Sequence, residues 1–281
     1  MFKKIGILGA GTMGNGIANV IAKNDNQVIM VDIDRDNLEK GYQSIEKNFN
    51  RSVKKERMTE SEKEAALARI TTSTKMESLS DVDLVIEAAV ENLEIKKEIF
   101  TNLDEIVKDD AVLATNTSAL SITEIATVTD RKDKVIGIHF FNPVPMMKLV
   151  EIIRAAETSD ECYNQVSEFV ASINKEAVKV NEAPGFVVNR ILIPMINEAV
   201  YILQEGVASA EDIDLAMKLG ANHPIGPLAL ADLIGLDVCL AIMETLHEEL
   251  GEDKYRPCPL LRKKVRAEQL GRKTGKGFYN Y

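Results

Sequence analysis

The sequence predicts two domains, a doubly wound α/β domain over residues 1–183 and an all-helical domain over residues 184–281. Short apolar runs alternate with amphipathic stretches in the first part, as they do in βαβ units. These runs are almost continuously apolar, which is typical of parallel strands buried on both faces of a sheet. After Pro184 the strand pattern ends and only helical spacing follows.

Strands and helices are expected to alternate along the first domain. The expected strands are Ile5–Leu8, Val28–Ile33, Leu84–Ala88, Ala111–Thr115 and Val135–Phe141. The expected helices are Thr12–Lys23, Asn37–Asn48, Asn92–Val107 and Ser121–Ala126. Residues 37–68 are longer and more charged than an ordinary crossover between strands. They therefore predict two helices that form an arm projecting from the sheet.

The second domain is expected to contain helices only. A long helix covers Phe186–Gly206, and Pro194 inside it predicts a kink. Further helices are expected at Ile213–Leu219, Leu228–Leu250 and Pro257–Leu270, before a glycine-rich basic tail. Several helix faces carry more apolar residues than a free surface favours, so we expect a homodimer through this domain.

Composition excludes several classes of function. The formal net charge of −10 over 281 residues argues against binding nucleic acid or an anionic membrane through a general basic surface. No apolar run approaches the roughly 18 residues of a membrane helix, and the N-terminus enters a strand pattern without a signal peptide. The three cysteines are widely spaced and form no metal-ligand cluster. They predict free thiols in a reducing compartment, so we expect a cytoplasmic protein without a bound metal.

The segment GAGTMG, residues 9–14, lies between an expected strand and an expected helix. In this position the GxGxxG pattern indicates a Rossmann-type dinucleotide site. The first glycine allows a tight turn, the second lets the backbone approach a pyrophosphate, and the third lets helix and strand pack closely. The helix N-terminus adds N–H groups and a positive dipole. The expected cofactor-binding residues here are Gly9, Gly11, Thr12, Met13 and Gly14.

Asp32 ends the second expected strand, eighteen residues beyond Gly14. A carboxylate there can accept hydrogen bonds from both hydroxyls of the adenosine ribose and repels a 2′-phosphate. NAD(H) is therefore favoured over NADP(H), although Arg35 could partly offset the repulsion.

Residues 135–151, VIGIHFFNPVPMMKLVE, combine a histidine at the end of an apolar run with a carboxylate in the next apolar run. A proline-rich turn between the runs brings Glu151 back beside His139. An imidazole oriented by a carboxylate is the usual construction of a general base. For an isolated pair, a core histidine and a solvated glutamate would be the better interpretation.

Six motifs in order and with family spacing resemble the short-chain L-3-hydroxyacyl-CoA dehydrogenases, in particular the bacterial 3-hydroxybutyryl-CoA dehydrogenases. They are GAGTMG with Asp32, IEAAVENLEIKK (86–97), ATNTSALSIT (114–123), GIHFFNPVPMMKLVE, APGFVVNR (183–190) and GRKTGKGFY (271–279). The resemblance implies NAD(H)-dependent interconversion of a 3-hydroxyacyl-CoA and its 3-keto form, as used in fatty acid and butanoate metabolism. Acetoacetyl-CoA and (S)-3-hydroxybutyryl-CoA are the expected substrates.

The resemblance also implies roles for individual residues. His139 would be the general base, Glu151 its orienting partner, and Ser118 and Asn189 hydrogen-bonding groups for the substrate oxygens. Taken alone, Ser118 could instead be a helix cap and Asn189 a polar residue on a helix face.

Cofactor and CoA contacts follow from the same resemblance. Glu91 and Lys96 would lie near the nicotinamide ribose, although an ordinary surface pair is the alternative. Lys54 and Lys55 on the arm would meet the CoA phosphates. The remaining cofactor-side residues are Asn116, Ser118, Asn142 and Lys273.

Two alternatives stay open from the sequence. A β-hydroxyacid dehydrogenase also pairs a Rossmann domain with a helical domain, but such enzymes typically use a catalytic lysine, and here Arg190 follows Asn189. A non-catalytic nucleotide-binding protein is the other alternative. A complete set of Ser118, His139, Glu151 and Asn189 argues against it, because a binding module has no use for an oriented base.

Overall fold

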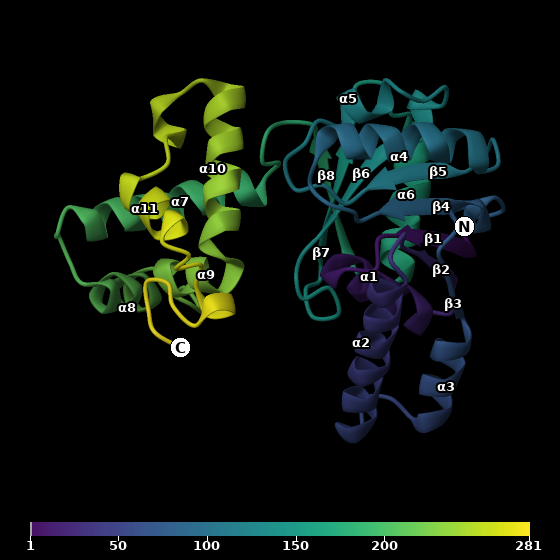
Figure 1. Cartoon of the computed structure of the whole chain (residues 1–281), viewed down its shortest axis with the longest axis horizontal. Coiled ribbons are helices and arrows are strands. Elements are labelled where there is room, and N and C mark those ends of the chain that lie inside the picture. The colour runs from purple at the N-terminus through teal and green to yellow at the C-terminus, as the bar shows by residue number, and fades with distance from the viewer. Residues whose placement is uncertain (1) are drawn as a thin grey trace. The chain divides into compact units, whose positions relative to one another are not determined.

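The computed structural model describes residues 2–281. The chain divides into two compact units, one ending at Glu182 and the other running from Ala183 to Tyr281. The first unit contains the whole sheet, and the second is helical (Figure 1). In the described residues, no helix combines the length and apolar character needed to cross a membrane.

The first unit is built on one sheet with the strand order β3-β2-β1-β4-β5-β6-β7-β8. Neighbouring strands are parallel except for the antiparallel pair β6 and β7. The five expected strands are confirmed. The strands are β1 (Lys4–Leu8), β2 (Gln27–Val31), β3 (Ile70–Ser73), β4 (Leu84–Glu87), β5 (Val112–Thr115), β6 (Val135–Phe140), β7 (Leu149–Arg154) and β8 (Glu176–Asn181).

Of the other three strands, β7 coincides with the apolar run that carries Glu151, which was not among the expected strands. Sequence patterning missed β3 and β8, which are the two edge strands of the sheet. Most residues of β8 are exposed or half-buried, and only the first residue of β3 is buried. Because an edge strand has a neighbour on one side only, it does not need the continuous apolar run that marks a central parallel strand.

Helices cover both faces of this sheet. Residues of α1, α2 and α6 share one core cluster with Ile86, Ile138 and Ile152 of the strands. Helix α5 lies on the opposite face, where Ile122 approaches Gly137 of β6 so closely that a Cβ there would lie 2.9 Å from it. The helices are α1 (Thr12–Lys23), α2 (Arg35–Lys54), α3 (Glu60–Ala68), α4 (Leu93–Ile106), α5 (Ile122–Ala126) and α6 (Asp160–Ser172), with short turns η1 (Met76–Leu79) and η2 (Lys132–Lys134).

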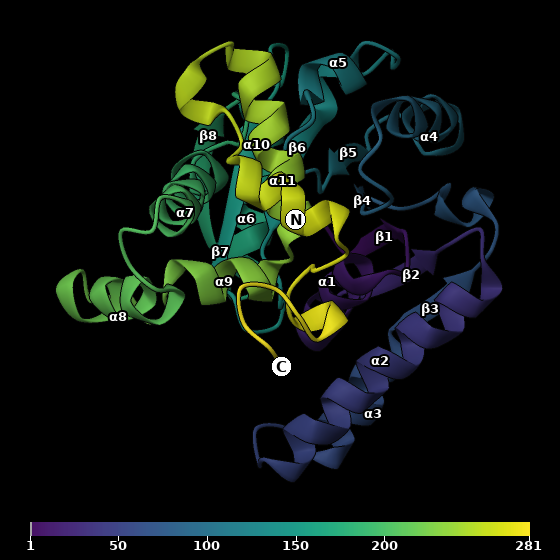
Figure 2. The ribbon, with the colours of Figure 1, turned by 60° about the vertical axis from the view of Figure 1, so that its left-hand side comes forward.

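The predicted arm is formed by α2 and α3, which lie side by side and extend away from the sheet (Figure 2). Asp34 caps α2, and Thr59 and Glu62 form a capping box at the start of α3. These caps satisfy N–H groups that would otherwise lack partners at each helix start. Helix α2 extends beyond the expected Asn37–Asn48 at both ends.

Strand alternation separates two kinds of side chain at the carboxyl edge of the sheet. Ile86 and Ile138 point into the apolar core beside α1, so the adjacent Glu87 and His139 point to the opposite face. Thr115 lies opposite Glu87 in the ladder between β4 and β5. A row of buried polar groups therefore forms on the face that α5 covers.

The second unit has its own apolar core. The expected single helix over Leu228–Leu250 is wrong, because Gly235 has φ = 108° and divides it into two. Asp232 accepts hydrogen bonds from the backbone N–H groups of Phe278 and Tyr279, both at 2.9 Å, and so anchors the C-terminal tail. The helices are α7 (Val188–Gln204), α8 (Ala210–Gly220), α9 (Pro227–Ile234), α10 (Leu236–Leu250) and α11 (Pro259–Arg266), with η3 (Asp253–Tyr255) and η4 (Arg272–Thr274).

Candidate active site

The β6–β7 hairpin places Glu151 directly opposite His139 in the strand register. The distance between His139 Nδ1 and Glu151 Oε2 is 2.8 Å. The two residues are only 4% and 1% exposed. Glu151 is therefore not a solvated glutamate, and the carboxylate holds one nitrogen of the imidazole in a fixed orientation.

Ser118 contacts the other nitrogen of the same ring. Its hydroxyl oxygen lies 3.2 Å from His139 Nε2 and comes from the loop that follows β5. The imidazole thus lies between a carboxylate on one side and a hydroxyl on the other. These three hydrogen-bonded residues are called the Ser118–His139–Glu151 series below. The imidazole of the series can accept a proton at Nε2, and Glu151 can stabilise the resulting positive charge, as a general acid–base group requires.

The glycine loop has the geometry that a dinucleotide site needs. Gly9 has φ = 101°, and a Cβ there would lie 2.6 Å from the carbonyl oxygen of Ala88. A Cβ at Gly14 would collide with the carbonyl oxygen of Gly9. At Gly11, by contrast, a Cβ would meet no atom within 4 Å, so the fold itself leaves this position open. A ligand approaching the backbone is the physical reason for a glycine there, and the loop fits NAD(H).

Asp32, directly after β2, supports this loop through its carboxylate. Its Oδ2 accepts the N–H of Ala10 at 2.8 Å, and its Oδ1 accepts the N–H of Asp34 at 3.0 Å. Each carboxylate oxygen has a second lone pair, so both can still accept a ribose hydroxyl.

Glu87 is a buried residue of the site that the sequence reasoning did not single out. Its carboxylate accepts two hydrogen bonds from Lys96 Nζ, at 2.7 and 2.8 Å, and one from the hydroxyl of Thr115 at 2.7 Å. Glu87 and Lys96 are both 0% exposed. The signal available in the sequence was a carboxylate ending the apolar strand β4, nine residues before a lysine. The alternative of Glu91 and Lys96 as a surface pair is wrong, because Lys96 is fully buried.

Glu91 orders the loop that carries Ser118. One carboxylate oxygen of Glu91 accepts hydrogen bonds from the hydroxyl of Thr117 at 2.6 Å and from the backbone N–H groups of Ser118 and Ala119 at 2.8 and 3.2 Å. The other lies 3.6 Å from Lys96 Nζ. Lys96, Glu91 and Ser118 are therefore linked to His139 through consecutive polar contacts.

The structure places the remaining predicted residues in different surroundings. Asn116 is buried, and its side-chain oxygen accepts the N–H of Phe140 at 2.8 Å, while Asn142 is exposed in the loop between β6 and β7. Asn189 lies in the first turn of α7 in the second unit. Lys273, in η4 of that unit, pairs with Asp237 at 2.5 Å. The two arm lysines, Lys54 and Lys55, are exposed at the end of α2.

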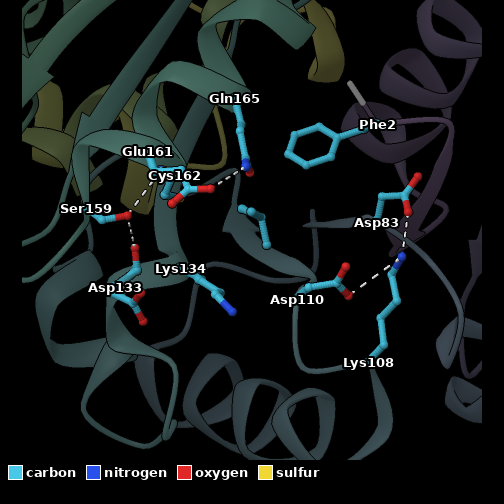
Figure 3. A pocket seen from close by; sticks show the side chains of 11 residues that line it. Phe2, Asp83, Lys108, Asp110, Asp133, Lys134, Ser159, Glu161, Cys162 and Gln165 are labelled. Carbon is cyan, nitrogen blue, oxygen red and sulfur yellow. Dashed lines mark hydrogen bonds and ion pairs between the residues drawn. The ribbon is translucent and has the colours of Figure 1, made fainter.

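Two cavities lie away from the Ser118–His139–Glu151 series. The first, of about 430 Å³, opens at the amino ends of the strands, where Lys108 pairs with both Asp83 and Asp110 (Figure 3). Cys162 lines this cavity, and burial raises the pKa of its thiol to about 12, so it is not a nucleophile at neutral pH. The second, of about 530 Å³, lies beside the start of α2. Residues 2–281 contain no group of three or more side chains that could hold a metal ion.

The fold and the site together define a class of protein, the nicotinamide-dependent dehydrogenases. Their shared features here are a doubly wound sheet, a glycine loop that is open at Gly11, a carboxylate directly after β2 and an oriented imidazole at the same sheet edge. The family model described as the NAD-binding domain of 3-hydroxyacyl-CoA dehydrogenase matches residues 4–183. The model for the C-terminal domain of the same enzyme matches residues 185–281. The chain belongs to the 3-hydroxyacyl-CoA dehydrogenase family and is an NAD-binding oxidoreductase.

Relatives match this chain over its whole length. A 3-hydroxybutyryl-CoA dehydrogenase from Clostridioides difficile is 55% identical over 278 residues, covering 99% of each chain. One from Bradyrhizobium diazoefficiens is 53% identical over 281 residues, covering 100% of this chain and 96% of the relative. The crystal structure of an (S)-3-hydroxybutyryl-CoA dehydrogenase from Ralstonia eutropha has a TM-score of 0.97 at 52% identity, covering 100% of this chain and 99% of that one.

Proposed function

We propose that this chain catalyses the NAD(H)-dependent interconversion of (S)-3-hydroxybutyryl-CoA and acetoacetyl-CoA, with His139 as the general acid and base. The Ser118–His139–Glu151 series carries the proposal, because its imidazole is held between a hydroxyl and a buried carboxylate. The names of the relatives at 53–55% identity support the four-carbon substrate.

NADH supplies the hydride that reduces C3 of the ketone. The His139 imidazolium donates its Nε2 proton to the carbonyl oxygen as C3 gains the hydride, which leaves an alcohol and a neutral imidazole. In the oxidative direction the same nitrogen takes the hydroxyl proton. Glu151 stabilises the charged ring in both directions. Each ketone reduced consumes one proton, so reduction is favoured more strongly as the pH falls.

Other residues are proposed to hold the two ligands. Ser118 and Asn189 would hydrogen-bond the substrate oxygens, and Lys54 and Lys55 would meet the CoA phosphates. Asp32 would hold the adenosine ribose and favour NAD(H) over NADP(H). The other proposed cofactor contacts are Gly9, Gly11, Thr12, Met13, Gly14, Glu91, Lys96, Asn116, Asn142 and Lys273.

The loss of NADH absorbance on addition of acetoacetyl-CoA tests the reaction. Turnover is expected with acetoacetyl-CoA and not with free acetoacetate. His139→Gln should lower kcat by about 10²–10⁴-fold while the Kd for NADH stays near the wild-type value. Wild-type turnover in this variant would overturn the role of His139. Activity on the free acid alone would overturn the CoA substrate.

We infer further that two copies of the chain associate through the helical unit. Leu215 and Leu219 lie one turn apart on α8 and are 46% and 78% exposed. Neighbouring exposed leucines on one helix face favour a protein partner. We also infer a reducing, cytoplasmic setting, because all three cysteines are buried free thiols.

A further inference from the structure

We propose that Lys175 is a positioning residue for the cofactor, because its buried ammonium group holds the loop that carries Asn142. This loop, residues 141–148, joins β6 to β7. The inference rests on the proposed function in one respect, namely that Asn142 contacts the bound NAD(H).

Lys175 lies in the turn between α6 and β8 and is 7% exposed. Its Nζ donates hydrogen bonds to the carbonyl oxygens of Val144 at 2.5 Å and of Met147 at 2.6 Å. These two oxygens belong to the middle and the end of the loop. One side chain from a different part of the sequence therefore fixes the path of the loop backbone.

The hydrogen-bond partners of this ammonium group indicate that it holds the loop. Within residues 2–281, no carboxylate pairs with Lys175, and burial lowers the pKa of its ammonium group. A buried cation without an ion-pair partner costs free energy that an apolar side chain would avoid. The compensation it receives comes from the two loop carbonyl groups, which require hydrogen-bond donors in turn.

The loop has two further points of attachment. The N–H of Glu176 donates to the carbonyl oxygen of Lys148 at 2.8 Å. Val144 packs against Gly16 of α1, where a Cβ would lie 3.1 Å from the Val144 side chain. The loop is thus held between the helix that begins at the glycine loop and the turn that contains Lys175. Asn142, at its exposed start, is positioned relative to the dinucleotide site through these contacts.

The Kd for NADH, measured by fluorescence on the full chain, tests the proposal. Lys175→Met keeps the apolar stem and removes the donors, and it should weaken NADH binding about tenfold. At saturating NADH and acetoacetyl-CoA, kcat should stay within about threefold of the wild type, because the Ser118–His139–Glu151 series is intact. Lys179→Met is the matched control, since Lys179 is exposed on β8 and lies 5.0 Å from the Tyr163 ring. This control should leave the Kd unchanged.

A double-mutant cycle separates positioning from a general loss of stability. In an Asn142→Ala background, Lys175→Met should have little further effect on the Kd for NADH, because the contact that it positions is already absent. Fully additive effects of the two substitutions on the Kd would overturn the proposal. So would a folded Lys175→Met variant that binds NADH as the wild type does.

If Lys175→Met does not fold, Gly16→Ala tests whether the position of the loop controls NADH binding. Alanine favours the helix over glycine, but its methyl group would lie 3.1 Å from the Val144 side chain, so Val144 and the loop must shift to make room. NADH binding should weaken in this variant, and an unchanged Kd would overturn the proposal. NADH binding requires no acyl-CoA substrate. An error in the proposed substrate would therefore appear as absent turnover with normal NADH affinity in the wild type, and the two failures are distinguishable.

Discussion

At the scale of residues, the candidate active site consists largely of buried polar side chains that each have a specific partner. Glu87, Thr115, His139 and Glu151 are at most 4% exposed and lie on one face of the sheet. In such an environment hydrogen bonds are strong, and a polar group that loses its partner is costly. Substitutions that keep shape and change charge therefore test their roles separately.

Glu151→Gln should preserve the packing of the site and lower kcat. The neutral amide can still contact His139 Nδ1, but it cannot stabilise the imidazolium that forms during oxidation. We expect kcat to fall about 10²–10⁴-fold, with a Kd for NADH close to that of the wild type. Steady-state kinetics and NADH fluorescence measure the two quantities. A variant with normal kcat would show that the carboxylate charge has no role in proton transfer.

The buried Glu87–Lys96 pair should dominate the stability of its region. Replacing Glu87 by Gln removes the closest carboxylate charge from the buried Lys96 ammonium and leaves only Glu91, at 3.6 Å. We expect the free energy of unfolding to fall by about 3–5 kcal/mol. The double variant Glu87→Gln/Lys96→Met removes both charges and should recover part of this loss. Urea unfolding of Glu87→Gln, Lys96→Met and the double variant gives the coupling free energy between the two side chains. Simple additivity of the two losses would show that the charges do not interact.

At the scale of elements, a single glycine ends α9 and allows α10 to begin. Gly235 has φ = 108°, and a Cβ there would lie 2.9 Å from Asp237 Oδ1 and 3.1 Å from Lys273 Nζ. Gly235→Ala should therefore lower the free energy of unfolding by about 1–3 kcal/mol. Gly220→Ala, at the end of α8 with no atom within 4 Å of the added Cβ, is the matched control and should be neutral. Equal melting temperatures for both variants would contradict this account.

Asp83 connects the start of β1 to the loop before β5. Its carboxylate accepts N–H groups of Lys3 and Lys4, at 2.7 and 3.0 Å, and Lys108 Nζ at 2.6 Å. Burial alone would raise the pKa of Asp83, but these hydrogen bonds outweigh it and the pKa lies below its ordinary value of 3.8. Because the folded state holds the proton less tightly than the unfolded state, this contribution is present above pH 3.8 and is lost as the pH falls through the lowered pKa.

Asp83→Asn should accordingly lower the free energy of unfolding at neutral pH, and the loss should be smaller at acidic pH. We expect a loss of about 1–2 kcal/mol at pH 7, modest because the side chain is 28% exposed. The difference from the wild type should shrink as the pH approaches and passes below 3.8. Urea unfolding across this range measures it. A difference that is independent of pH would show that the carboxylate charge does not contribute.

At the scale of the whole molecule, the proposed dimer can be tested by measuring the oligomeric state of variants. The double variant Leu215→Lys/Leu219→Lys places two charges on the exposed apolar face of α8. If this face lies in the interface, sedimentation should show monomers for the double variant and dimers for the wild type. Lys218→Glu, one residue away, is the control for a change of charge alone. A dimeric double variant would exclude this face from the interface.

The sequence by itself determined the class of fold and the residues that we propose for the chemistry. Near-continuous apolar runs are required only where a strand is covered on both faces, so the central strands were predictable and the edge strands β3 and β8 were not. Gly14 is visible in the GAGTMG pattern because a Cβ there would collide with the carbonyl oxygen of Gly9 in the same motif, so the constraint is local. The pairing of His139 with Glu151 was predictable for a similar reason, since one short turn separates their strands.

Only the tertiary structure decided which distant groups meet. Ser118 reaches His139 because β5 and β6 are neighbours in the sheet. Glu87 meets Lys96 because α4 packs so that this lysine faces the end of β4. Lys175 reaches the carbonyl oxygens of a loop 28 to 31 residues earlier in the chain. These contacts depend on strand order and on which face a side chain occupies, and residue type and local spacing do not specify either.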